Sequence, residues 1–259
     1  MSNFEDYNKK IDVIKAITDD QIKVPHHIPV VTYIQESEHL FVWCEYDKEE
    51  LTAKGLKWKV VEDLPVRGGA LREAESKWFI QQSQRRASAK ILHRELSKGY
   101  NLRNELIHHF NYAFRDNSSL IKKVKKLVKG TTHAHMIQSL NDLSVLGGFN
   151  RELLKKIGFD FTLLDLASRT ADNLDSKYAE GSWKSEDYLE AKKIRDQAYT
   201  HLKEAVDYIR EHGRYVFWNN PARLKGYRSD YRRMLNQRST RRNRVPEPCP
   251  GNVPITNEL

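Results

Sequence analysis

Arginine is concentrated in one stretch near the carboxyl end of the chain, YRSDYRRMLNQRSTRRNR (residues 227–244). Over residues 222–244 there are nine Lys or Arg side chains and a single acid, Asp230. A guanidinium group presents a planar fork of donors that matches the oxygens of phosphate and carboxylate groups. The segment is therefore predicted to bind a polyanion, through Arg223, Lys225, Arg228, Arg232, Arg233, Arg238, Arg241, Arg242 and Arg244.

Two tyrosines, Tyr227 and Tyr231, lie among these basic residues. Aromatic rings beside arginines stack on bases in proteins that bind RNA or single strands, which makes both candidates for base stacking. The same spacing of four residues puts both rings on one face of a helix, and that face could instead pack on the rest of the protein. The pattern is compatible with three alternatives. The segment could bind a nucleic acid or other polyphosphate, it could bind an acidic protein surface, or it could be a solvated tail.

Glu and His pairs raise the question of a metal site. Glu36 with His39 and Glu105 with His108 have the i, i+3 spacing of di-metal carboxylate bundles, and Glu62 could add a ligand. A chain with ten His and nineteen Glu gives such pairs by chance. We therefore expect no metal and no other cofactor. The positions 103 residues further along do not repeat the pairs, since they hold Ser139, Asp142, Tyr208 and Glu211.

Motifs of nucleophilic or nucleotide-dependent catalysis are missing from the sequence. It contains no Gly-x-Ser-x-Gly, no Gly-x-x-x-x-Gly-Lys-Ser/Thr and no Gly-x-Gly-x-x-Gly. Cys44 lies in an apolar stretch typical of a core thiol, and Cys249 has no activating base beside it. We expect a protein that is not an enzyme.

Composition limits where the protein acts. The chain has 259 residues, 39% hydrophobic and 31% charged, and its net charge of +9 comes mostly from residues 222–244. No apolar run is long enough to span a bilayer, and the first residues lack the pattern of a secretory signal. Two cysteines cannot form a disulfide framework. We expect a cytoplasmic protein that does not enter a membrane.

Helices are predicted for most of the chain, because no proline occurs between Pro65 and Pro221 and apolar residues recur at spacings of three and four. Ser185 is predicted to start one helix and Gly213 to end it. A break is predicted in LPVRGGALRE (residues 64–73), where Pro65 removes a donor and glycines weaken a helix. One helix should carry an apolar stripe formed by Ile194, Ala198, Leu202, Ala205 and Ile209.

An internal repeat is indicated when the sequence is compared with itself. An offset of 103 residues pairs similar residues near both ends of two segments, 26–128 and 129–231. The stretch 30–46, rich in β-branched residues, could form a hairpin, but its counterpart 133–149 has good helix formers, so a helix is expected in both. The matching pairs include Ile34 with Ile137, Leu40 with Leu143, Leu51 with Leu154, Gly55 with Gly158, His109 with His212, Phe114 with Phe217, and Asn117 with Asn220.

The predicted fold is all-α, a tandem duplication of an antiparallel helical-bundle unit followed by a basic arm. The expected domains are an N-terminal helix and lead-in (1–25), helical unit 1 (26–128), helical unit 2 (129–221), an Arg-rich segment (222–244) and a Pro-containing tail (245–259). Each unit should contain a first helix, a second starting near Asp47 or Asn150, and a third ending near His109 or His212. Lysines of a linker helix, residues 120–129, are expected to face water.

The function predicted from these features is that of a non-catalytic helical scaffold whose Arg-rich segment binds a polyanion, with nucleic acid as the preferred partner. An alternative is a structural subunit of a homo- or hetero-oligomeric assembly, whose basic arm docks on acidic neighbouring subunits. A bundle-type metalloenzyme is the third possibility and has the least support.

Overall fold

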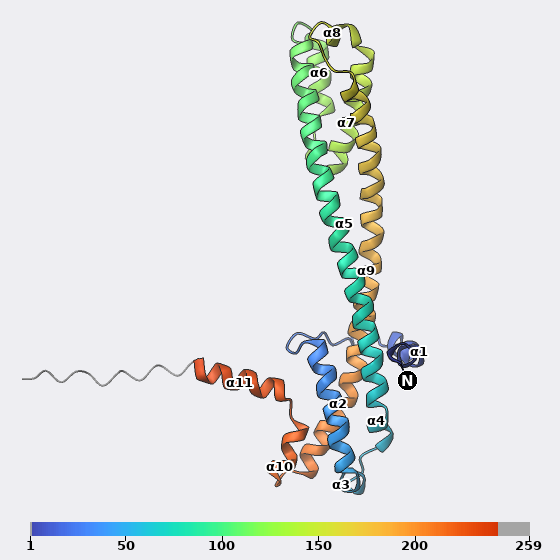
Figure 1. Cartoon of the computed structure of the whole chain (residues 1–259), viewed down its shortest axis with the longest axis vertical. Helices are drawn as coiled ribbons and strands as arrows, with labels where there is room; N and C mark the ends of the chain where they lie inside the picture. Colours follow the sequence, from blue (N-terminus) through green and yellow to red (C-terminus); the bar gives the residue numbers. More distant parts are fainter. Residues whose placement is uncertain (1, 243–259) are drawn as a thin grey trace, which may run out of the picture. The chain divides into compact units, whose positions relative to one another are not determined.

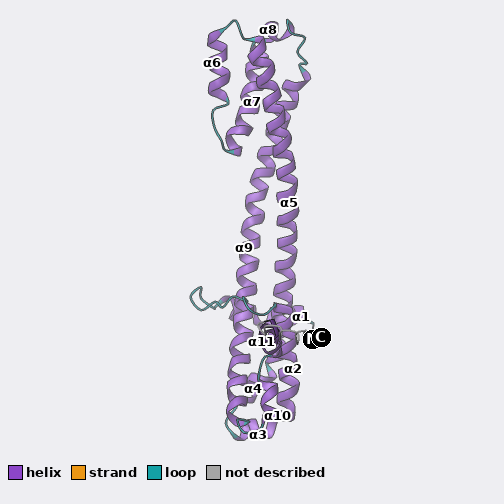
Figure 2. Cartoon of the chain, turned by 90° about the vertical axis from the view of Figure 1, so that its left-hand side faces the viewer, coloured by secondary structure: helices purple, strands orange, loops and turns teal. Residues whose placement is uncertain are grey.

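The computed structural model describes the backbone of residues 2–242 and their side chains apart from 181–185 and 240–242. Within this range every regular element is a helix and there is no strand, which confirms the all-α prediction (Figure 1 and Figure 2). Among the described helices, none has both the length and the apolar character needed to cross a bilayer. The predicted tail (245–259), which includes Cys249, lies outside the described residues.

The helices differ greatly in length, and two of them account for much of the chain. They are α1 (Asn3–Lys15), α2 (Val30–Tyr46), α3 (Lys48–Ala53), α4 (Trp58–Glu62), α5 (Leu64–Ala113), α6 (Ser118–Leu127), α7 (His133–Phe149), α8 (Arg151–Lys155), α9 (Thr162–Val216), α10 (Pro221–Leu224), the 3-10 turn η1 (Lys225–Tyr227) and α11 (Asp230–Arg242).

The break predicted in residues 64–73 is wrong. Helix α5 begins at Leu64 and continues through both glycines, so Pro65 lies in the first turn, where its missing N–H is no loss. The chain breaks one residue earlier, at Asp63, which caps α4. Gly69 serves packing, because a Cβ atom there would collide with the carboxylate of Asp6.

The described chain divides into two compact units. Bundle 1 contains residues 2–76 and 193–242, and bundle 2 contains residues 77–192. Helices α5 and α9 each contribute residues to both units. The expected units, 26–128 and 129–221, were each continuous in sequence. Bundle 1 instead combines residues from the first expected unit with residues from the second.

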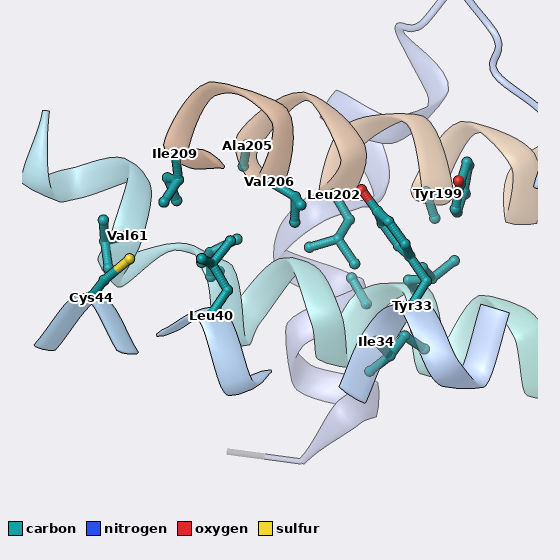
Figure 3. Close-up of a cluster of buried hydrophobic side chains, with 14 of the residues drawn as sticks. Tyr33, Ile34, Leu40, Cys44, Val61, Tyr199, Leu202, Ala205, Val206 and Ile209 are labelled. Atoms are coloured by element: carbon teal, nitrogen blue, oxygen red, sulfur yellow. The ribbon is translucent and has the colours of Figure 1, made fainter. Parts of the chain in front are cut away.

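The core of bundle 1 lies between α1, α2, α4, the first part of α5 and the carboxyl-terminal part of α9. Figure 3 shows Leu40 and Cys44 of α2 on one side and Val206 and Ile209 of α9 on the other. The predicted apolar stripe on α9 is confirmed, because Ala198, Leu202, Ala205 and Ile209 are buried and Ile194 is partly buried against them.

Bundle 2 has a separate core made from α5, α6, α7, α8 and the first part of α9. Phe110 and Phe114 of α5 are buried there, with ring centroids 5.3 Å apart, and Phe159 lies 6.0 Å from Phe110. On α6, Leu120 and Val124 are buried while the lysines are exposed, as expected for a solvated face.

Several backbone features recur 103 residues apart. Helix α7 starts and ends 103 residues after α2, and α9 ends 103 residues after α5. Asn117 and Asn220 both cap the helix that follows, accepting from the amides of Leu120 and Arg223. A left-handed glycine also recurs at this offset, at Gly55 (φ 93°) and Gly158 (φ 68°).

Gly213 does not end a helix, and Ser185 does not start one, because both lie inside α9. Gly213 is buried, and a Cβ atom on it would overlap the ring of Tyr227. The glycine therefore makes room for an aromatic side chain that arrives from the carboxyl-terminal segment.

This packing predicts an unfavourable Gly213→Ala substitution. Alanine normally stabilises a helix interior by up to about 1 kcal/mol relative to glycine, but overpacking a filled core costs about 1–3 kcal/mol. We expect a net loss in the free energy of unfolding, measured by urea denaturation. Gly148→Ala in α7 is the matched control, because nothing lies within 4 Å of its Cβ position. Equal gains in stability for both variants would contradict the assigned packing.

Candidate anion-binding site

The Arg-rich segment is attached to bundle 1 through Tyr227. Its side chain is fully buried, and its ring stacks on Phe217 with centroids 5.5 Å apart and planes 12° from parallel. The Tyr227 hydroxyl donates to Asp47 Oδ2 at 2.7 Å. This residue, predicted as a base-stacking group, lies in the core, so its ring is not presented at the surface.

Arg223 is also engaged inside bundle 1. Its guanidinium pairs with the buried carboxylate of Asp47 and lies over the ring of Trp43, 4.8 Å from the centroid. In return, Trp43 Nε1 donates to the carbonyl oxygen of Arg223 at 3.2 Å. The charge of Arg223 therefore neutralises Asp47 and is not displayed for a ligand.

A second carboxylate, Glu36 of α2, holds the start of α11. Its Oε1 atom accepts from Ser229 Oγ and from the Tyr231 amide, each at 2.9 Å, while Oε2 accepts from Arg210 Nη2 at 2.8 Å. Burial acts to raise the pKa of Glu36, but the hydrogen bonds from Tyr231, Arg210 and Ser229 outweigh it and the pKa falls below its ordinary value. Glu36 is therefore ionised at neutral pH.

Beyond this attachment, α11 leads away from the other helices of bundle 1 (Figure 1). Tyr231 is partly buried against the bundle 1 core, whereas Met234 and Leu235 are exposed. The first turn of α11 thus packs on the bundle core, and the described arginines of this helix, Arg232, Arg233 and Arg238, are exposed.

A cleft of about 1170 Å³ lies between α9 and the segment from η1 to α11, and we call it the α11 cleft. Its apolar and aromatic lining, which we call its base, consists of Ile28, Tyr33, Tyr199, Leu224 and Tyr227. Seven basic side chains line it against two acidic ones: Lys203, Arg210, Arg214, Lys225, Arg228, Arg232 and Arg233, with Asp207 and Glu211. A concave surface lined mainly by one sign of charge focuses the electrostatic potential and attracts counter-ions.

Some of the predicted anion-binding residues line the α11 cleft and others do not. Lys225, Arg228, Arg232 and Arg233 line the α11 cleft, and Arg238 is exposed further along α11. Arg233 also pairs with Asp230 at 2.7 Å. The side chains of Arg241 and Arg242, and all of Arg244, lie outside the described part.

Sequence reasoning missed the wall that α9 provides. Lys203, Arg210 and Arg214 bring positive charge to the cleft from a helix predicted only for its apolar stripe. Lys203 is paired with Asp207 at 2.7 Å and Arg210 with Glu36, whereas Arg214 forms no ion pair within the described residues. The available signal was their spacing, because positions 203, 207, 210 and 214 share one face of a helix.

Groups considered for catalysis or metal binding are not assembled into a site within the described chain. No cluster of three or more His, Cys, Asp or Glu side chains is placed to hold a metal ion there. Glu36 is occupied by its contacts with the α11 segment. Burial raises the pKa of the Cys44 thiol to about 12, which keeps it protonated at neutral pH.

Comparison of the chain with protein-family models, with curated proteins and with solved structures finds no match.

The contacts of Glu36 predict that Glu36→Gln loosens the start of α11. Hydrogen bonds to a charged group are worth about 1.5–3 kcal/mol, so hydrogen exchange at the Tyr231 amide should speed up about tenfold or more. Glu38→Gln on the same helix is the control, because Glu38 pairs with exposed Arg72 and not with α11. Similar exchange rates in the two variants would contradict the attachment.

The lowered pKa of Glu36 gives this attachment a pH dependence. The stabilising contribution is present above the ordinary pKa of a glutamate, about 4.3, and is lost as the pH falls through the lower pKa of the folded state. Protection of the Tyr231 amide, corrected for the intrinsic exchange rate, should decrease in that range for the wild type. The Glu36→Gln variant should show no such decrease.

Proposed function

We propose that this protein is a non-catalytic helical scaffold that binds a polyanion, with nucleic acid as the preferred partner, through the basic segment at residues 222–244. The observation that carries this proposal is the α11 cleft, where seven basic side chains meet two acidic ones. The cleft extends the basic segment by residues of α9, so positive charge from two separate parts of the sequence converges on one surface.

Phosphate is the anion that suits this surface best. Within the described residues, the guanidinium groups of Arg214, Arg228 and Arg232 form no ion pair. Arginine forks bind phosphate oxygens in pairs, and a chain of phosphates releases many counter-ions when it is neutralised. A nucleic acid supplies phosphates at regular intervals and can follow the arginines from the cleft along α11.

We also propose that the scaffold arose by duplication of a unit of about 103 residues, and that the basic arm is the second copy's version of α6. Supporting this, the helix bounds, the asparagine caps and the left-handed glycines recur at that offset. A ring also faces a glycine in each bundle: Phe110 faces Gly147, and Tyr227 faces Gly213. The offset of 103 relates three core positions, namely Cys44 to Gly147, Phe110 to Gly213 and Val124 to Tyr227.

This correspondence predicts what happens when core residues of bundle 1 are replaced by those at the corresponding positions of bundle 2. Gly213→Phe alone should strongly destabilise bundle 1, because the Tyr227 ring already fills the space beside Gly213. Adding Cys44→Gly and Tyr227→Val would install the residues found in bundle 2 and should restore part of the lost free energy of unfolding. A triple variant less stable than Gly213→Phe would argue against equivalent positions.

The alternative, a structural subunit of a larger assembly, has one observation in its favour. Large apolar side chains are exposed at matched positions: Tyr46 (77%) with Phe149 (85%), and Tyr112 with Tyr215. Surfaces of this kind are common where other protein chains bind. An oligomer that persists after nuclease treatment and at high salt would favour this alternative over the binding of nucleic acid.

The proposed function predicts that removing charge from the arm weakens nucleic-acid binding more than removing it elsewhere. The test variant changes Arg238, Arg241, Arg242 and Arg244 to Gln. The matched control changes Lys122, Lys123, Lys125 and Lys126 of α6 to Gln, so both lose the same net charge. Neither set includes a buried residue among those whose burial is described, whereas a chain ending at Pro221 would lose Tyr227 from the core.

Binding of labelled single-stranded RNA, single-stranded DNA and duplex DNA is measured across a salt series. We expect the arm variant to lose at least about tenfold in affinity and to reduce the slope of log K against log salt by about 3, following roughly 0.7–0.9 per phosphate contact. The control should keep the wild-type slope. Equal losses in both variants would show that only net charge matters, and no binding by the wild type would refute the proposal.

A further inference from the structure

The base of the α11 cleft contains an unsatisfied polar group. Tyr33 is only 3% exposed, and its hydroxyl has no hydrogen-bond partner among the described residues. Its ring lies 4.9 Å from that of Tyr199, which also lines the cleft. Because a buried hydroxyl without a partner costs free energy, an acceptor on a bound ligand, or a water molecule that the ligand holds, would stabilise this arrangement.

Positive charges line both walls of the same cleft. Arg214 comes from α9, and Arg228 and Arg232 come from the segment that Glu36 fixes to α2. Burial raises the pKa of Tyr199, and Asp207 raises it further, whereas the nearby charges of Arg232 and Arg210 act to lower it. Arginine charge therefore lies close to the aromatic base of the cleft.

The fold itself does not require this charged wall. The wall residues of α9 are Lys203, Asp207, Arg210, Glu211 and Arg214. The positions 103 residues earlier, on α5 of bundle 2, are Tyr100, Asn104, Ile107, His108 and Asn111, and none of them is Lys, Arg, Asp or Glu. Helices α5 and α9 end 103 residues apart but carry different side chains on this face. The helical fold alone therefore does not account for the charged residues of the α11 cleft.

We propose that the α11 cleft binds a nucleotide unit, with its phosphate on Arg214, Arg228 and Arg232 and its sugar or base toward Tyr33 and Tyr199. This inference rests on the proposed function and narrows it to nucleotides whose bases are accessible. A duplex keeps its bases stacked and paired inside, so it presents only phosphates to the cleft, whereas single strands offer base edges and faces.

The size of the cleft agrees with such a ligand. Sites for small molecules have volumes of roughly 300–1,000 Å³, and the α11 cleft is slightly larger, at about 1170 Å³. It accommodates one nucleotide with room for its neighbours. The unit can therefore come from a free nucleotide or from a single strand that continues along the arginines of α11.

The experiment uses the full chain and three probes: uridine monophosphate, an oligouridylate of about ten nucleotides, within the roughly 4–16 that single-strand sites occupy, and an RNA duplex of the same length. Arg214→Gln removes a cleft charge that is outside the arm. Tyr33→Phe removes only the unpartnered hydroxyl. Lys59→Gln is the control, because Lys59 is exposed in bundle 1 and does not line the cleft.

We expect the single strand to bind more tightly than the duplex at equal salt. Arg214→Gln should weaken single-strand binding about tenfold and reduce its salt slope by about 0.7. Tyr33→Phe should weaken it about threefold or more with an unchanged slope, and should leave thermal stability equal or higher, since an unsatisfied group is removed. Lys59→Gln should bind as the wild type does.

Two results would overturn the proposal. One is wild-type affinity for the single strand in both cleft variants; if the arm variant still loses binding, the proposed function stands without the cleft. The other is a preference for the duplex. Uridine monophosphate binding that is lost in Arg214→Gln, with no binding of either polymer, would keep the cleft as a nucleotide site and refute the proposed function.

Discussion

The attachment of the basic segment depends on one buried carboxylate, Asp47. A charge removed from water is tolerated only with a partner, and removing the partner of a buried ion pair costs about 3–5 kcal/mol. Arg223 supplies the opposite charge and Tyr227 a hydrogen bond, so both must fold onto bundle 1. Once they are in place, Glu36 can cap the start of α11, and the α11 cleft exists as a result.

The secondary structure was largely predictable, because helix periodicity is a local property. The stripe on α9 and the helix at 30–46 were predicted from spacing and from the comparison of the two segments. The grouping into bundles was not predicted, because similarity between two segments of sequence does not indicate which segments pack together. The prediction for Gly213 failed because a glycine that makes room for Tyr227 looks, in sequence, like a helix end. The prediction for Pro65 failed because α5 begins at Leu64, which puts the proline in the first turn.

The candidate site was predicted in part. Basic residues at 225, 228, 232 and 233 were identified from composition, and they line the cleft. Arg223 and Tyr227 have the same composition signal but serve the core, because their partner Asp47 is 176 and 180 residues away in the chain. The α9 wall was missed since its charges are spread along a helix and gather only when α11 lies opposite. Local sequence thus predicted where basic residues are concentrated, and long-range contacts decide which of them line the cleft and which are held in bundle 1.

The central claim is that residues 223–228 are part of folded bundle 1 and form one side of the α11 cleft. Limited trypsin digestion of the native chain tests it most directly, with the cleavage sites identified by mass spectrometry. The account predicts that the bonds after Arg223 and Lys225 are cut only as fast as bundle 1 unfolds, because the Arg223 carbonyl and Gly226 lie against Trp43 and the side chains of Arg223 and Tyr227 are held by Asp47. Cleavage there at the rate of a free peptide of the same sequence would contradict it.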